Sequence, residues 1–128
     1  MSAFLLDTNA LIYSTTIPGQ LGRRARAAIE SADALYISAA SLWEIAIKHR
    51  KRPELMPQSA RAFNAYAAEI GIQVIAVDAT IINALELIED FRHDDPFDRI
   101  IVATSKERVL PLITEDSALR DYLRNAVW

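Results

Sequence analysis

Four acidic residues of this chain stand where their carboxylates could act together. They are Asp7, Glu44, Asp98 and Asp116. Asp7 and Asp116 follow short apolar runs of the kind that form buried strands, and the other two lie near the beginning of apolar helical segments. Carboxylates held close together repel one another, and they become tolerable when a hard divalent cation lies between them. The types and positions of these residues therefore predict a metal-dependent enzyme.

The composition narrows the choice of metal. The chain has no cysteine and only two histidines, which excludes thiolate sites and disfavours a zinc site built on imidazole. Carboxylate ligands favour Mg²⁺ or Mn²⁺, and such ions promote phosphodiester hydrolysis. We predict that Asp7 and Asp98 bind the metal directly, and that Glu44 and Asp116 complete its coordination or orient the attacking water. Three neighbouring residues offer hydroxyl or amide groups that could orient these ligands: Thr8, Asn9 and Thr114.

The alternation of strand-like and helix-like segments indicates how the acids are positioned. Four apolar runs read as strands: Phe4–Leu6, Leu35–Ser38, Val74–Val77 and Leu112–Thr114. Helical patterns cover six segments: Leu21–Ala32, Ser41–Arg50, Pro57–Ile70, Asp78–Phe91, Pro96–Arg108 and Ser117–Arg124. The terminal Ala126–Trp128 could add a short edge strand. This order predicts an α/β fold with a mostly parallel sheet and helices on both faces.

The predicted fold brings the four acids to one edge of the sheet. In a right-handed strand–helix–strand unit, the helix after a strand begins at that strand's carboxyl end. The ends of the first and last strands, and the starts of the helices near Ser41 and Pro96, then share one edge. Open α/β proteins bind their ligands at this edge.

Each acid also has a purely structural explanation. Ser41 and Glu44 have the spacing of a capping box, in which Glu44 returns a bond to the Ser41 amide. The segment Asp95–Asp98 looks like an N-cap, a proline at the first helical position and an acid in the first turn. Asp7 and Asp116 could each cap the turn that follows. Because uncharged Ser, Thr and Asn also cap helices, four acids at one edge favour the metal site.

Length and composition limit the class of protein. The chain has 128 residues, 52% of them hydrophobic, and fits one globular domain over residues 1–128. No apolar run approaches the ~20 residues that cross a bilayer, and the start Met1–Ala3 lacks a basic signal-peptide region. The absence of cysteine is compatible with a reducing cytoplasm, which is the expected compartment. A formal net charge of −3 argues against coating nucleic acid by charge alone, yet does not exclude a nuclease.

One basic stretch stands out, Lys48–Arg52, which is followed by Pro53. We interpret it first as a solvated helix C-terminus that complements the helix dipole. The alternative interpretation is a rim that contacts phosphate beside the acidic site.

Four blocks of the sequence resemble the PIN-domain nucleases, and most closely the VapC-type toxins of type II toxin–antitoxin systems. The blocks occur in the family's order and spacing: Leu5–Asn9, Ser41–Ile45, Asp95–Ala103 and Leu112–Asp116. The resemblance implies a three-layer α/β/α sandwich and a Mg²⁺- or Mn²⁺-dependent endoribonuclease. It assigns the family's acidic quartet to Asp7, Glu44, Asp98 and Asp116. Asp95 is then an additional acid, most simply a cap.

The same resemblance implies partners for the chain. They are an RNA substrate, an antitoxin whose segment covers the acidic groove and often presents a cation, and a second copy of the chain in a homodimer; no membrane is implied. In the VapC-type subgroup, His93 and Arg99 belong to the same stretch as the third block, Asp95–Ala103. We interpret His93 as a structural or substrate-side residue rather than a metal ligand. Trp43 and Trp128 are assigned to the core in preference to an interface.

Two other functions fit parts of the pattern. An aspartyl-phosphate phosphatase or receiver-type domain also has an Asp after its first strand. The phosphatase pattern expects a second acid two residues later, where this chain has Asn9, and it needs a lysine, whereas none falls among the acidic blocks before Lys106. The other alternative is a PIN-like module that binds a partner without catalysis, which a missing acid would have favoured.

Overall fold

The computed structural model describes residues 2–128 and contains one parallel sheet of four strands. The strands are β1 (Ala3–Leu6), β2 (Ala34–Ser38), β3 (Gln73–Ile75) and β4 (Leu112–Ile113). Their order in the sheet is β3-β2-β1-β4, and every neighbouring pair is parallel. The first strand of the chain, β1, therefore lies inside the sheet, between β2 and β4.

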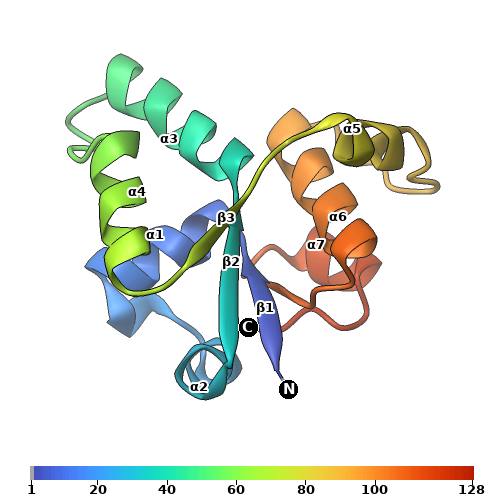
Figure 1. The fold of residues 1–128 in the computed structure, drawn as a ribbon, viewed down its shortest axis with the longest axis horizontal. Coiled ribbons are helices and arrows are strands. Elements are labelled where there is room, and N and C mark those ends of the chain that lie inside the picture. Colours follow the sequence, from blue (N-terminus) through green and yellow to red (C-terminus); the bar gives the residue numbers. More distant parts are fainter. Residues whose placement is uncertain (1) are drawn as a thin grey trace.

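Between and after these strands, residues 2–128 form seven α-helices and one short 3-10 helix. They are α1 (Thr8–Thr16), η1 (Pro18–Gln20), α2 (Arg23–Ser31), α3 (Ala39–Lys51), α4 (Ala60–Glu69), α5 (Ala79–Glu86), α6 (Pro96–Arg108) and α7 (Ser117–Tyr122). Figure 1 shows the sheet edge-on, with α1 to α4 on one side and α5 to α7 on the other. The predicted three-layer α/β/α sandwich is thus confirmed. None of these helices in residues 2–128 has the length and apolar character needed to cross a membrane.

Alternating side chains of the strands supply the two halves of the core. Leu5 and Leu6 are both fully buried but belong to different clusters, as do Leu112 and Ile113. Leu6 and Ile113 pack with helices α1 to α4, whereas Leu5 and Leu112 pack with α6 and α7. Because successive residues of a strand point to opposite faces, a central strand covered on both faces must be apolar at every position. This is why the run before Asp7 has no polar residue.

Helix α1 was absent from the predicted elements, and the physical reason is local. Its sequence, Thr8–Thr16, is rich in Thr and β-branched residues, which have low helix propensity. The helix forms because Asp7 caps it and because Ala10 and Leu11 are completely buried against the sheet. Tertiary burial has overridden propensity at this position.

The other differences concern the ends of elements. Helix α3 begins two residues earlier than predicted, at Ala39, with Ser38 as its cap, and β3 ends at Ile75 rather than Val77. At the C-terminus, Val127 forms an isolated parallel bridge with Ile113, so the predicted edge strand is reduced to one bridge. Helix α6 has the predicted bounds.

Candidate active site

The predicted site residues converge on one small polar cleft at the carboxyl edge of the sheet. The cleft has a volume of about 150 Å³ and is lined by Asp7, Thr8, Asn9, Glu44, Lys48, Asp95, Asp98 and Asp116. The lining includes all four acids of the predicted quartet. Of the eight predicted residues, only Thr114 does not line the cleft; it is fully buried, and its hydroxyl accepts a hydrogen bond from the Asp116 amide (3.1 Å).

Asp7 is the most deeply buried of the acids. It follows the last residue of β1, is only 7% exposed, and accepts a hydrogen bond from the Ala10 amide at 2.7 Å, which makes it the N-cap of α1. Burial raises the pKa of this carboxyl from 3.8 to about 6, and the negative charges of Asp98 and Glu115 add to the increase. The Thr114 hydroxyl and the Ala10 amide act in the opposite direction. A bound cation would therefore stabilise the charged form of this buried carboxylate.

Asp98 lies across the cleft, in the first turn of α6. Its pKa is also raised to about 6, first by burial, then by the charge of Asp95, and to a smaller extent by Asp116 and Glu44. His93 lowers it. Three acids thus disfavour the charge of Asp98, as expected where carboxylates crowd together.

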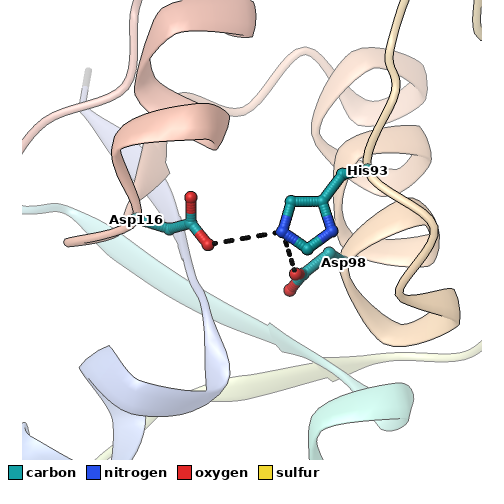
Figure 2. Close-up of side chains that lie close together, drawn as sticks. All are labelled: His93, Asp98 and Asp116. Carbon is teal, nitrogen blue, oxygen red and sulfur yellow. Dashed lines mark ion pairs between the residues drawn. The ribbon is translucent and has the colours of Figure 1, made fainter.

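His93 stands between two of the acids, as Figure 2 shows. Its Nε2 lies 3.4 Å from Asp98 Oδ2 and 3.8 Å from Asp116 Oδ2. The ring stacks on Phe91 with 5.8 Å between centroids, and Arg99 donates hydrogen bonds to the carbonyls of Phe91 (3.0 Å) and His93 (3.1 Å). The segment before α6 is therefore fixed so that the imidazole points at the acids.

Glu44 is held by two neighbours, and neither contact is a helix cap. The Thr8 hydroxyl donates to Glu44 Oε1 (2.7 Å), and Lys48 Nζ lies 3.0 Å from Glu44 Oε2. The capping-box interpretation of Ser41 and Glu44 is wrong, because α3 starts at Ala39 and Ser41 is buried inside the helix, 3.0 Å from the Thr8 hydroxyl. Glu44 instead faces the cleft.

The contact between Thr8 and Glu44 yields a prediction. Thr8→Val removes the hydroxyl with little change of volume, which leaves Glu44 with Lys48 as its remaining side-chain partner. Because groups that orient metal ligands are typically worth 10–100-fold in affinity or activity, we expect a loss of roughly that size. A titration with Mn²⁺ measures the loss of metal affinity, and cleavage rates measure the loss of activity. Thr15→Val is the control, since the Thr15 hydroxyl bonds only to carbonyls of its own helix; equal behaviour of the two variants would contradict the orienting role.

Three of the acids do act as helix caps, as their structural explanations predicted. Asp95 Oδ1 accepts from the amides of Phe97 (2.9 Å) and Asp98 (3.1 Å). Asp116 Oδ1 accepts from the first-turn amides of α7 at 2.8 and 3.2 Å, and Asp7 caps α1 through its own Oδ1. Each cap is made by one oxygen, and the other oxygen of the carboxyl remains for a ligand. Capping and site formation are therefore compatible.

Sequence reasoning placed Lys48 beside the acids only through the alternative interpretation of the basic stretch, whereas in the structure Lys48 lines the cleft. It lies one helical turn after Glu44, so the i,i+4 spacing of the two residues was the available signal. Residues 48–51 form the last turn of α3, as the helix-dipole interpretation of the basic stretch expects, and Lys48 also lies at the acidic cleft. Contact with phosphate stays a prediction. The observation that no lysine falls among the acidic blocks before Lys106 holds for the sequence, yet Lys48 of α3 reaches the cleft in the structure.

Asn9 lines the cleft but its amide is turned toward another acid. Its Nδ2 lies 3.4 Å from Glu115 Oε1, which also accepts from the Tyr13 hydroxyl at 3.1 Å. Glu115 was not predicted as a site residue, and its charge contributes to the raised pKa of Asp7.

Comparisons with known proteins agree with this architecture. The family model of the PIN domain matches residues 4–124. A curated relative, Ribonuclease VapC22 of Mycobacterium tuberculosis (strain ATCC 25618 / H37Rv), is 27% identical over 123 residues, which cover 95% of this chain and 93% of the relative.

Solved structures share the fold along almost the whole chain. A toxin–antitoxin complex from Klebsiella pneumoniae is similar with a TM-score of 0.68 and 24% identity, covering 98% of this chain and 96% of the other. FitAcB from Neisseria gonorrhoeae has a TM-score of 0.63 and 22% identity, and VapBC2 from Rickettsia felis bound to a promoter DNA fragment has 0.65 and 14%, both with the same coverage. At these identities the likeness extends to the fold alone.

Proposed function

The chain belongs to the PIN-domain family, and from that premise we propose that it is a metal-dependent endoribonuclease, the toxin of a type II toxin–antitoxin pair. The observation that carries the proposal is the convergence of Asp7, Glu44, Asp98 and Asp116 on one cleft. The similarity to a protein named as a ribonuclease and to a toxin–antitoxin complex from Klebsiella pneumoniae supports the same function. A phosphatase or receiver-type function has no comparable support, and a non-catalytic module would not need four acids.

The chemistry of the cleft fits a hard divalent cation. Its lining offers carboxylate oxygens from four separate elements of the fold, and the raised pKa values of Asp7 and Asp98 express an unfavourable charge that a cation would relieve. Mg²⁺ and Mn²⁺ prefer such oxygen ligands. Such an ion, when bound, neutralises phosphate charge and makes water a better nucleophile.

The residues of the cleft have different roles in the proposed hydrolysis. We propose that Asp7 and Asp98 hold the cation and that Asp116 completes its surroundings. Glu44, fixed by Thr8 and Lys48, orients the attacking water. Water adds to phosphorus, one P–O bond breaks, and the leaving oxygen takes up a proton. The ammonium of Lys48, half-exposed at the cleft, is suited to contact a phosphate oxygen of the substrate.

The proposal includes partners and a compartment. An antitoxin that presents a cation would complement the negative cleft, and a second copy of the chain would form the homodimer expected of such toxins. Because both the substrate and the antitoxin are proposed to be cytoplasmic molecules, the cytoplasm is the proposed compartment.

A cleavage assay and a growth assay test the function. The purified chain, supplied with Mg²⁺ or Mn²⁺, should cleave at least one member of a panel of tRNA, rRNA and mRNA. Its overproduction should arrest growth, and co-production of the small protein encoded by the neighbouring gene should restore it. Harmless overproduction of soluble protein, together with no cleavage of any RNA, would contradict both the nuclease and the toxin assignments.

A further inference from the structure

An aromatic pair, made of the exposed Trp43 and the half-buried Phe97, lies next in sequence to two acids of the cleft. Trp43 and Phe97 lie 54 positions apart in the sequence, yet their ring centroids are 5.0 Å apart with an edge-to-face angle of 72°. Trp43 is 56% exposed, so its assignment to the core is wrong. We call the two rings the aromatic platform. The sequence contains no cluster of aromatic residues here, because the platform is assembled only when α3 and α6 meet.

The platform is connected directly to the candidate catalytic acids. Trp43 precedes Glu44 on α3, and Phe97 precedes Asp98 on α6. Consecutive Cα atoms are about 3.8 Å apart, so each ring starts one residue away from a carboxylate that lines the cleft. A nucleotide whose phosphate lies at the acids would therefore have its base within reach of the rings.

The two rings are anchored differently. Phe97 packs on the buried cluster of Ala40, Ile81, Ile100 and Ala103, which joins α3, α5 and α6. Trp43 belongs to none of the core clusters of the described residues. The fold thus fixes Phe97, and Phe97 supports an indole that contributes little to the core. A large planar side chain kept in solvent beside a site is suited to bind another flat group.

The charge along α3 indicates the kind of molecule that brings this flat group. After Glu44 the same helix presents Lys48 at the cleft, then the exposed Arg50 and Lys51. A polyanionic strand passing the acids would meet these cations, and the acids themselves would need the metal to accept its phosphate. A nucleic acid strand has both features: its negative phosphates match the cations of α3, and its flat bases match the aromatic platform.

We propose that the aromatic platform stacks on an unpaired base of the RNA strand beside the phosphate at the acidic cleft, with Trp43 as the principal contact. This inference rests on the proposed nuclease function and adds a residue that positions the substrate. Stacking on aromatic side chains is sequence-tolerant because every base has a π face, and it requires a base that is not stacked within a duplex.

Tryptophan fluorescence and binding measurements test the aromatic platform directly. Single-stranded oligoadenylate is titrated, with Mg²⁺, into protein carrying Glu44→Gln, which keeps the residues proposed to hold the cation and removes the carboxylate proposed to orient the water, so that the RNA is not consumed. The emission of Trp43 should be quenched in a saturable manner, and Trp43→Phe, which leaves Trp128 as the only tryptophan, supplies the baseline. The same sugar–phosphate backbone without bases should not quench. Trp43→Ala should weaken oligoadenylate binding roughly 5- to 150-fold, which corresponds to one lost stacking contact, and Trp43→Phe should weaken it less.

The matched control is Tyr66→Ala, which removes another exposed aromatic ring on α4, a helix that contributes no residue to the lining of the cleft. The Tyr66→Ala protein should bind RNA as tightly as the protein with the native Tyr66 does. Equal binding by Trp43→Ala and native protein, with no quenching of Trp43, would overturn the proposal. A second outcome would also overturn it: Trp43 is quenched when the protein concentration alone is raised, and Trp43→Ala no longer forms the dimer. The pair would then be a protein interface. In both cases cleavage by the unaltered chain would leave the nuclease function intact, whereas a chain that cleaves no RNA would refute that function instead.

Discussion

Asp98→Asn should reduce RNA cleavage by at least about 100-fold while the protein remains folded. Groups that merely orient metal ligands are worth 10–100-fold, and the loss of a ligand should exceed this. The fold should survive because burial and three neighbouring acids already disfavour the Asp98 charge, so its removal relieves repulsion. Single-turnover cleavage rates at saturating Mn²⁺, with circular dichroism as the check on folding, measure the effect.

Asp95→Asn is the matched comparison, three residues away in the same helical turn. Asp95 caps α6 through Oδ1, and asparagine caps a helix about as well as aspartate. We therefore expect nearly normal cleavage from this variant. If Asp95→Asn were inactive and Asp98→Asn active, the assignment of the third acid would be reversed.

The comparison matters because capping alone could have explained most of the acids from the sequence. In the structure, Asp7, Asp95 and Asp116 are caps and also line the cleft. The reason is geometric: a helix that follows a parallel strand begins at the carboxyl edge, so its N-terminal amides and the ligand site occupy the same place. Cap residues at this edge are near any ligand, and only the excess of negative charge distinguishes a site from a set of caps.

The parts of the fold that could be predicted are those in which local pattern and burial agree. The continuous apolar runs before Asp7 and Asp116 are strands covered on both faces, and the Asp95-Pro96 start fixes the bounds of α6. The four acids could be placed together for the same reason, since the order of strands and helices alone assigns them to one edge.

The parts that could not be predicted depend on contacts between distant segments. The partners of Glu44 include Thr8, 36 positions away, and Trp43 meets Phe97 only across two packed helices. No local pattern reports such pairs. His93 likewise reaches Asp98 and Asp116 because Arg99 and Phe91 fix the preceding segment, which has no regular secondary structure.

Burial of Asp7 connects the site to the stability of the fold. An increase of its pKa from 3.8 to about 6 corresponds to about 3 kcal/mol of destabilisation once the carboxyl is ionised in the folded state. Because the folded state holds the proton more tightly than the unfolded state, this part of the stability is present below about pH 4 and is lost as the pH rises through about 6. At neutral pH without metal, Asp7 thus reduces the free energy of unfolding.

Asp7→Asn should therefore raise the melting temperature of the metal-free protein at pH 8 while abolishing cleavage. Asparagine keeps an oxygen to accept from the Ala10 amide and removes the buried charge. The increase should be on the order of 10 °C, since about 3 kcal/mol of unfavourable charge is removed and ~1 kcal/mol corresponds to roughly 3–6 °C for a domain of this size, and it should shrink toward pH 4, where the native carboxyl is protonated. Thermal melts of both proteins across this pH range, in chelator, measure the difference.

Added metal should reverse the order of the melting temperatures of native and Asp7→Asn protein. A cation bound only by the folded state stabilises it by about 2.7 kcal/mol at 100 times its Kd, and Asp7→Asn removes one of the carboxylates proposed to hold it. Mg²⁺ or Mn²⁺ at pH 8 should accordingly raise the melting temperature of the native protein more than that of Asp7→Asn, and below about pH 6 protons should compete with the metal and weaken the response. If Asp7 were only a cap, both proteins would respond equally to metal, and asparagine would leave the melting temperature unchanged or lower at every pH; that outcome would remove Asp7 from the site.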